Sequence, residues 1–299
     1  MALGARTSAL TSPARHRWTA RTVVVLMVAV LALAVSNLIG WATAVSGLTR
    51  LMAAWPHLPP WGAVLLTALA VSVLAQVGSP ARWRVVLARA LSVGAATVAA
   101  VMLVEYGLDA TWGIDRWWFG AALDAVHSPY PGRISPQSAV GIVLLAILVG
   151  LIRVDARPWP ATQVALFVVA LVIPAVALLG YLLVGRPLLP VSAATGVTVA
   201  GALGALAVGV GAALSRPDRA PVATYLDLPY RGALTRLLAV LAGTPVVVAL
   251  VRHASVAAGL PSDEAWVAAV GVAAVVVGLA LVIALRRELT LSQERQSAL

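Results

Sequence analysis

The sequence predicts an all-α fold: a polytopic transmembrane helical bundle of about eight spans, built from helical hairpins. Three observations predict it. The chain of 299 residues is 61% hydrophobic and only 11% charged, which leaves too little polar surface to coat a soluble globule. Apolar stretches of roughly 20 residues recur along the chain. The basic residues between them are all arginine, and the chain has no cysteine, which excludes thiolate chemistry and cysteine metal sites.

Eight apolar stretches are the predicted spans, in chain order. They lie at about 23–45, 61–78, 86–106, 137–152, 162–184, 191–214, 236–251 and 265–285. The first is too long for the core of a cleaved signal peptide, which holds roughly 7 to 15 residues. We therefore expect residues 1–22 to form an N-terminal tail, 23–285 the membrane domain, and 286–299 a C-terminal helix or tail.

The placement of arginine predicts the orientation of these spans. With the N-terminus inside, sixteen of the 21 arginines lie on the cytoplasmic side. The five that remain outside are Arg50, Arg116, Arg133, Arg186 and Arg252. This bias follows the positive-inside rule and predicts a multi-pass protein of the cell (inner or plasma) membrane with both termini cytoplasmic. It also accounts for the net charge of +10 without a nucleic-acid partner, so the lipid bilayer is the expected partner.

Two connections are longer than the others: an external loop at 107–135 and an internal loop at 215–235. The external loop is rich in aromatic and charged residues. We expect its segment from Asp115 to Arg133 to form an ordered cap over the outer helix ends, with Trp117, Trp118 and Phe119 at least partly buried, because these rings would otherwise expose an apolar patch. The internal loop is basic and is typical of a segment at the membrane surface.

Local signals predict where the fourth span begins and how the sixth packs. Ser135 followed by Pro136 fits an N-cap and a first-turn proline, which marks the start of the fourth span. Small residues let transmembrane helices approach closely, so four glycines predict close packing of the sixth span. These glycines are Gly201, Gly204, Gly209 and Gly211.

Few polar residues stand out as a candidate site. Glu105, at the outer end of the third span, is either a functional intramembrane acid or an interfacial residue, and we favour the interface. Asp124 and His127, close in sequence to Arg133, fit a metal or proton-sensing site or a solvated loop with a local ion pair, and we favour the ion pair. No Walker A loop, HExxH, GxSxG or dinucleotide-binding turn is present, so we expect no enzyme activity, cofactor or metal.

A weak internal repeat joins the starts of two spans. Residues 134–139 read Ile-Ser-Pro-Gln-Ser-Ala, and residues 188–193 read Leu-Leu-Pro-Val-Ser-Ala. Upstream, Glu105-Tyr106-Gly107 is loosely echoed by Gly180-Tyr181. These similarities fit either parallel repeats of helical hairpins or a chance likeness between apolar helices.

One stretch carries a resemblance to a known family. Residues 113–119 read Gly-Ile-Asp-Arg-Trp-Trp-Phe, and residues 129–139 read Pro-Tyr-Pro-Gly-Arg-Ile-Ser-Pro-Gln-Ser-Ala. This pattern resembles the N-terminal multi-pass membrane sensor regions of bacterial signalling proteins, where an aromatic motif after an acidic residue precedes a Gly-Arg-x-Ser-Pro-x-Ser/Thr-Ala helix entry. These regions also tend to have Gly-Tyr in the next span, a basic linker like residues 231–236, and a final helix that runs into the cytoplasm. Gly180-Tyr181 and the arginine-bearing C-terminus match these features. The resemblance covers about residues 86–299 and is most specific at 114–139.

In proteins of that kind the membrane region precedes an output domain, often a histidine kinase, a diguanylate cyclase or a phosphatase. This chain reaches Leu299 without one. The resemblance thus implies a sensor region that acts alone, belongs to a longer protein or binds a separate partner. The polar segment 286–295 holds no proline or glycine, so it is either a helical exit toward that output or a frayed tail.

These observations favour a non-enzymatic membrane sensor that relays a stimulus to a cytoplasmic signalling partner or through a homodimer. The alternative is a small transporter or a lipid-handling membrane protein. Transporters place charged groups around a cavity at the membrane midplane, whereas the middle of each span here is nearly all Ala, Val, Leu and Gly. A membrane-embedded enzyme ranks third, because no cluster of intramembrane Asp, Glu or His is visible.

Overall fold

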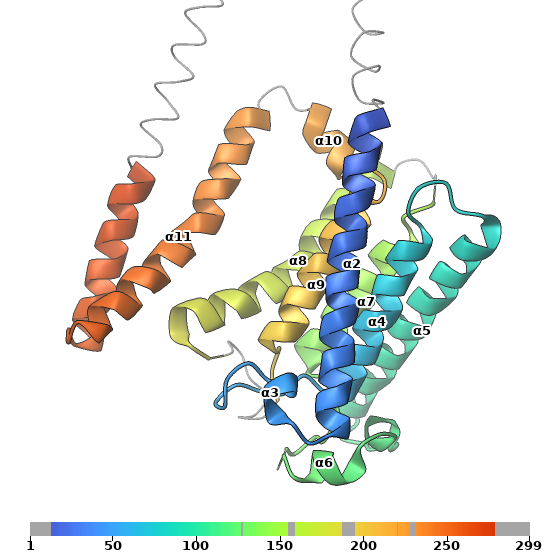
Figure 1. Cartoon of the computed structure of the whole chain (residues 1–299), viewed down its shortest axis with the longest axis horizontal. Coiled ribbons are helices and arrows are strands. Elements are labelled where there is room, and N and C mark those ends of the chain that lie inside the picture. Colours follow the sequence, from blue (N-terminus) through green and yellow to red (C-terminus); the bar gives the residue numbers. More distant parts are fainter. Residues whose placement is uncertain are drawn as a thin grey trace, which may run out of the picture. The chain divides into compact units, whose positions relative to one another are not determined.

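The computed structural model describes residues 13–126, 128–154, 159–186, 195–219, 221–227 and 231–278 (Figure 1). Over these residues the regular structure is helical and no strand occurs, which confirms the all-α prediction. The chain divides into two compact units: Met1–Tyr181 with Arg186–Leu226, and Leu182–Gly185 with Asp227–Leu299. The C-terminal segment 286–299 lies outside the described residues.

Four described helices are long and apolar enough to cross a membrane: Trp18–Ala42, Arg82–Gly107, Ala161–Val184 and Leu234–Ala257. Three further apolar helices, Pro60–Ala75, Pro136–Gly150 and Val199–Leu214, have 16, 15 and 16 residues. At about 1.5 Å per residue these three reach only about 24 Å, against about 30 Å of hydrocarbon in a bilayer. The helices are therefore those expected of a membrane protein, and the count of eight spans stays a prediction.

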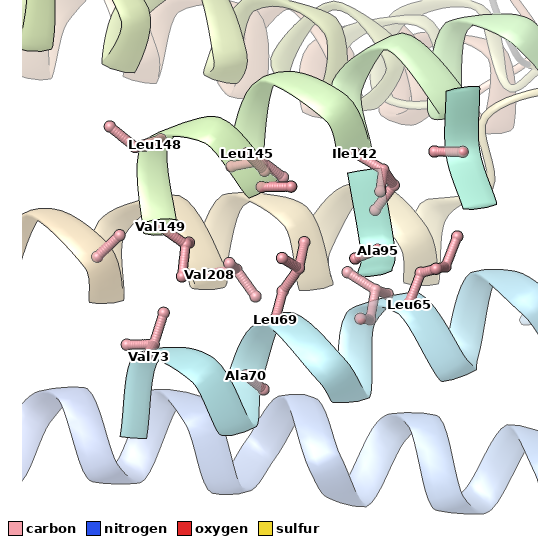
Figure 2. Packing of buried hydrophobic residues seen from close by; sticks show 14 of the residues in the cluster. Leu65, Leu69, Ala70, Val73, Ala95, Ile142, Leu145, Leu148, Val149 and Val208 are labelled. Atoms are coloured by element: carbon pink, nitrogen blue, oxygen red, sulfur yellow. The ribbon is translucent and has the colours of Figure 1, made fainter. Parts of the chain in front are cut away.

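The first unit is built around α4 (Pro60–Ala75). Four helices contact it: α2 (Pro13–Ala42), α5 (Arg82–Gly107), α7 (Pro136–Gly150) and α9 (Val199–Leu214). Figure 2 shows Leu69 of α4 among Leu145 of α7 and Val208 of α9, all three fully buried. Because α4 has neighbours around most of its circumference, its apolar residues show no single face and nearly all of them are buried.

Polar side chains tie these helices together inside the apolar core. Ser72 of α4 lies 3.0 Å from the Ser92 hydroxyl of α5, and its hydroxyl donates to the Ala88 carbonyl at 2.8 Å. Gln76, at the end of α4, donates from Nε2 to the Val149 carbonyl of α7 at 3.0 Å. Polar groups without water need such partners, so these bonds fix how α4 sits against α5 and α7.

Close packing of α9 through glycine, predicted from the sequence, is confirmed. A Cβ added to Gly204 would lie 2.8 Å from Leu66 Cδ1 of α4, and one on Gly211 would lie 2.6 Å from Met27 Cε of α2. A Cβ on Gly209 would lie 2.4 Å from Leu171 Cδ2 of α8 (Trp159–Val184). Each neighbouring side chain occupies the space that the missing Cβ leaves.

Helices α4, α7 and α9 begin at the end of the first unit where α2 and α5 end (Figure 1). Several short elements lie at this end as well. We call residues 108–135, between α5 and α7, the cap. It contains η1 (Ile114–Arg116) and α6 (Gly120–Asp124). Residues 43–59, the α2–α4 connection, contain α3 (Ser46–Thr49). At the other end of the unit, the predicted internal loop contains α10 (Val222–Asp227).

The start of α9 differs from the prediction. The apolar stretch begins at 191, but the helix begins at Val199 after the N-cap Thr198, whose hydroxyl accepts from the Gly201 amide at 2.9 Å. Residues 195–198 are not helical, because a threonine cap, and not the onset of hydrophobicity, sets the first turn. The second copy of the predicted repeat, 188–193, lies outside the described residues.

The second unit consists of α11 (Arg231–Ala257) and a helical segment at 262–278, together with the last residues of α8. Val248 of α11 packs with Ala269 and Ala273. The Arg252 guanidinium lies 4.9 Å from the centre of the Trp266 ring, and its Nη1 donates to the Leu183 carbonyl at 3.3 Å. Helix α11 starts within the predicted internal loop 215–235, so that connection is shorter than expected.

Candidate functional site

The most distinctive polar feature of the described chain is a buried charge cluster made of Glu105, Asp115 and Arg133. Their exposed fractions are 0%, 2% and 2%. Arg133 donates to Asp115 Oδ2 from Nε at 3.3 Å and from Nη2 at 3.2 Å. Its Nη2 also lies 3.5 Å from Glu105 Oε2 and donates to the Ala110 carbonyl at 3.1 Å. The guanidinium therefore links the end of α5, the cap and the entry to α7.

Each member of the charge cluster is held by its local structure. Glu105 lies in the last turn of α5, and its Oε1 accepts from the backbone amide of Trp112 at 2.8 Å, so the chain folds back over the helix end. Asp115 lies within η1. Arg133 comes two residues before the Ser135 N-cap of α7. Three segments that are distant in sequence thus meet at one point.

The charges in this cluster do not balance, since two carboxylates face one guanidinium. Asp115 Oδ1 is buried and has no hydrogen-bond partner among the described residues. A charge removed from water needs close compensation, and removal of one partner from a buried pair is costly. The arrangement therefore depends strongly on Arg133, the one cation that the structure places against both acids.

Two tyrosines enclose the guanidinium. The Arg133 Cζ atom lies 5.0 Å from the centre of the Tyr106 ring and 5.3 Å from that of Tyr130. The two rings also meet edge to face, with their centres 4.9 Å apart. A cation over an aromatic face is stabilised by the ring quadrupole, more so where water is excluded. The tyrosines thus add a second layer of stabilisation around Arg133.

Gly132 permits the close approach of the two chain segments. Its φ is +79°, a left-handed conformation that favours glycine, and a Cβ added there would lie 2.1 Å from the Asp115 carbonyl oxygen. No side chain fits at that distance. Gly132 therefore allows the segment just before α7 to pack directly against the backbone of η1.

Trp61, in the first turn of α4, is the second anchor of the cap. Its indole Nε1 donates to the Ile114 carbonyl at 2.7 Å. Its ring lies 4.7 Å from Trp118 and 6.0 Å from Trp117, measured between ring centres. The cap is thus attached to α4 as well as to α5 and α7.

The expected burial of the cap aromatics holds for Phe119 and is wrong for the two tryptophans. Trp117 is 66% exposed and Trp118 is 39% exposed, whereas Phe119 is partly buried, as expected. The cap is ordered by the buried cluster and by Trp61, so its own rings need not be inside. The exposed rings of Trp117 and Trp118 lie in the cap, and amphipathic rings of this kind suit a membrane interface.

Asp124 does not join the charge cluster. It forms an ion pair with Arg116, and both side chains are more than half exposed. This is the local surface ion pair that we favoured, with Arg116 as the partner, and such pairs contribute little to stability. His127, the other half of the predicted pair, lies outside the described residues.

Ser135 and Pro136 start α7 as predicted. The Ser135 hydroxyl accepts from the Ser138 amide at 3.2 Å, and Pro136 occupies the first turn. Three residues that contact the cap or Arg133 were not predicted as site residues: Trp61, Tyr106 and Tyr130. Trp61 looks like an ordinary interfacial ring, and Tyr106 and Tyr130 appear only as parts of motifs. Their positions next to Glu105 and in the Pro-Tyr-Pro-Gly-Arg segment were the signals available.

No group of three or more His, Cys, Asp or Glu side chains placed to hold a metal occurs among the described residues. The comparisons with known proteins were negative: no family model matches the chain, and neither does any curated protein or solved structure. The function is therefore inferred from the geometry of this chain.

Proposed function

We propose that this protein is a membrane-embedded sensor module, in which a stimulus at the cap shifts the helix bundle and thereby a cytoplasmic output. The observation that carries the proposal is the Arg133 cluster. The Arg133 guanidinium pairs with Asp115 within the cap and with Glu105 of α5, and Arg133 lies two residues before the N-cap of α7. A displacement of the cap is therefore passed to α5 through the ion pairs and to α7 along the chain. The Gly132–Ala139 motif, similar to that of bacterial sensor regions, supports the same reading.

A sensor needs two states that a stimulus can distinguish. Two carboxylates that share one guanidinium offer two such arrangements, one with Arg133 closer to Asp115 and one with Arg133 closer to Glu105. In the structure Arg133 Nη2 lies 3.2 Å from Asp115 Oδ2 and 3.5 Å from Glu105 Oε2, which is the first arrangement. Exchange between them moves the cap relative to α5, and packed helices respond to such shifts as discrete rearrangements.

The proposed topology has both termini and the 215–235 segment in the cytoplasm and the cap outside, with eight crossings. The arginine distribution supports it. The output partner is a cytoplasmic protein or domain, or a second copy of the chain, reached through the segment after Leu285. We propose no catalytic role for the chain itself.

One observation favours the alternative, a small transporter or lipid-handling protein. The N-cap residues of the three short helices, Pro59, Ser135 and Thr198, line one apolar cavity of about 40 Å³. Helix N-termini that meet inside a membrane are used by transporters to bind substrate. The cavity holds no charged side chain, and its volume suits little more than one water-sized occupant, so we rank this function second.

The test is a helix-phase experiment in the full chain. A dimerisation-dependent reporter is fused after Leu299, and one to four alanines are inserted between Arg287 and Glu288. Each residue turns a helix by about 100°, so a transmitting helix gives output that rises and falls across the series. The same alanines placed in a flexible linker after Leu299 are the control and leave output level. A flat series at Arg287, together with solute flux in proteoliposomes, would support the transporter.

A further inference from the structure

A second cavity, of about 510 Å³, opens at the cap end of the first unit. The end of α2 contributes Trp41, and the α2–α4 connection contributes Thr49, Arg50, Trp55 and His57. Opposite them lie small apolar residues of α6 and the turn after it: Ala122, Ala125 and Val126. The volume falls in the range of about 300 to 1,000 Å³ that is usual for small-molecule sites.

The charge on the cavity wall is positive. Arg50 is the charged side chain among the lining residues, which include no aspartate or glutamate. Its Nη1 donates to the Ala53 carbonyl of its own connection, which orients the guanidinium without neutralising it. A planar guanidinium that faces a cavity without an acid is suited to a carboxylate, which it can bind through two parallel hydrogen bonds.

His57 adds a group that responds to such a ligand. Its Nδ1 lies 2.6 Å from the Thr49 hydroxyl, and that hydroxyl donates its hydrogen to the Ser46 carbonyl at 3.0 Å. With the Thr49 hydrogen assigned to the Ser46 carbonyl, Nδ1 carries the proton of the neutral ring and Nε2 is the nitrogen that gains one. Burial lowers the pKa of His57, and Arg50 lowers it further. A bound anion acts in the opposite direction and favours the charged imidazolium.

The rest of the wall is apolar and aromatic. Trp41 is almost fully buried, and its Nε1 donates to the Leu58 carbonyl at 2.8 Å, so the polar edge of this ring is already occupied. Trp55 and several alanines complete the lining. Aromatic faces and methyl groups bind an apolar body, while Arg50 and His57 bind one charged end.

We propose that this cavity binds a small organic anion, with a carboxylate at Arg50 and an aromatic or aliphatic body between Trp41 and Trp55. The proposal rests on the proposed function, because it makes this anion the stimulus that the sensor detects. A lipid headgroup joined to its acyl chains offers the same combination of charge and apolar surface. The experiment therefore distinguishes a soluble acid from a lipid.

The cavity is connected to the charge cluster through shared walls. Trp41, His57 and Val126 also line a smaller cavity of about 20 Å³, whose other residues include Tyr130 and Arg133. An anion against His57 thus lies one side-chain layer from Arg133, which pairs with Glu105 of α5 and leads into α7. This is the route by which occupancy reaches the two helices.

The test uses 4-fluorobenzoate as the probe and the full chain in nanodiscs of zwitterionic lipid. Binding is followed by the broadening of the fluorine NMR line, beside 4-fluorobenzyl alcohol and 4-fluorobenzylammonium as neutral and cationic counterparts. We expect saturable binding of the benzoate and binding at least about tenfold weaker for the other two, because only the benzoate places a negative charge with two acceptor oxygens against the Arg50 guanidinium. Nanodiscs with added phosphatidylglycerol form a second arm. Competition there identifies a lipid headgroup as the occupant, and its absence identifies a soluble acid.

Matched variants locate the site. Arg50→Gln weakens binding by about tenfold or more, and Arg50→Lys, which keeps the charge, weakens it less. Arg116→Gln removes an exposed arginine at the same end of the unit that does not line the cavity, and leaves binding unchanged. Unaltered thermal unfolding shows that the variants fold. Equal binding of all three probes, no saturable binding, or benzoate binding that survives Arg50→Gln would overturn the proposal.

The two proposals fail in different ways. If benzoate binds and Arg50→Gln abolishes binding, but the alanine series gives flat reporter output, the anion site stands and the sensor function is wrong. If output varies with alanine insertion but no probe binds in an Arg50-dependent way, the sensor function stands and its stimulus is not an anion in this cavity.

Discussion

Arg133 is held by two carboxylates from separate segments, and its loss would leave both buried without a cation. We predict that Arg133→Met lowers the free energy of unfolding by about 3 to 5 kcal/mol, the usual cost of breaking a buried ion pair on one side. Reversible unfolding in detergent micelles, followed by circular dichroism, measures it. The control is Arg116→Met, at the exposed pair with Asp124, which costs less than about 1 kcal/mol. Equal effects of the two variants would contradict the account of the cluster.

The close contact at Gly132 can be tested by an alanine substitution. Gly78 is the matched control, because it has a similar left-handed conformation but open space where a Cβ would lie. Gly132 and Gly78 have φ of +79° and +73°, but a Cβ on Gly78 meets nothing within 4 Å. Both alanine variants lose about 1 to 2 kcal/mol from left-handed backbone strain. Gly132→Ala adds the clash with the Asp115 carbonyl, so we expect it to cost at least about 1 kcal/mol more in the same unfolding measurement. A smaller or absent difference would mean that the cap tolerates separation from α7.

His57 predicts a dependence of stability on pH. Its pKa is lowered from 6.5 by burial first and by Arg50 second, so below that value the unfolded chain binds more protons than the folded one. The resulting loss of stability is absent above about pH 6.5 and grows as the pH falls below it. Between about pH 7.5 and about pH 5.5, we expect the free energy of unfolding of His57→Gln to fall less than that of the unmodified chain. Parallel pH profiles of the two proteins would show that His57 is not buried in its neutral form.

The start of α7 could be predicted from its N-cap residues, whereas the start of α9 could not be predicted from hydrophobicity. Ser135 and Pro136 mark the first turn of α7, because N-cap chemistry depends only on neighbouring residues. Hydrophobicity alone placed the start of α9 near 191, whereas Thr198 caps it. Apolar residues also occur in extended segments that pack inside the protein, such as Val197, so an apolar run does not define a helix end.

The glycines of α9 make a prediction about helix packing. Gly204 lies against Leu66 of α4, while Gly94 of α5 has nothing within 4 Å of an added Cβ. We expect Gly204→Leu to destabilise the fold by about 1 to 3 kcal/mol through overpacking. Gly94→Leu, also within an apolar helix, changes stability by less than about 0.5 kcal/mol. Thermal unfolding of the two variants in micelles compares them, and equal stability would exclude a tight α4–α9 contact.

Across the protein as a whole, the buried charge cluster could be predicted only in part. Glu105 was singled out because an acid near a membrane span is rare and costly. Asp115 and Arg133 were singled out as the charged residues of the two motifs at 113–119 and 129–139. Their meeting depends on how the cap folds back over α5, which no local pattern encodes. For the same reason the pairing of Asp124 with Arg116 could not be predicted from the sequence. Trp61 was missed because its partner is a backbone carbonyl 53 positions away.

Sensing, anion binding and output all require that the cap end and the α10 end of the first unit face opposite sides of one membrane. The cysteine-free chain allows a direct measurement with single cysteines, Trp117→Cys in the cap and Asp218→Cys near α10, both at exposed positions. Intact cells are treated with a membrane-impermeant maleimide, and permeabilised cells serve as the control for reactivity. We predict labelling of Trp117→Cys in intact cells and of Asp218→Cys only after permeabilisation. Labelling of both in intact cells, or of Asp218→Cys alone, would contradict the proposed topology and the external sensor built on it.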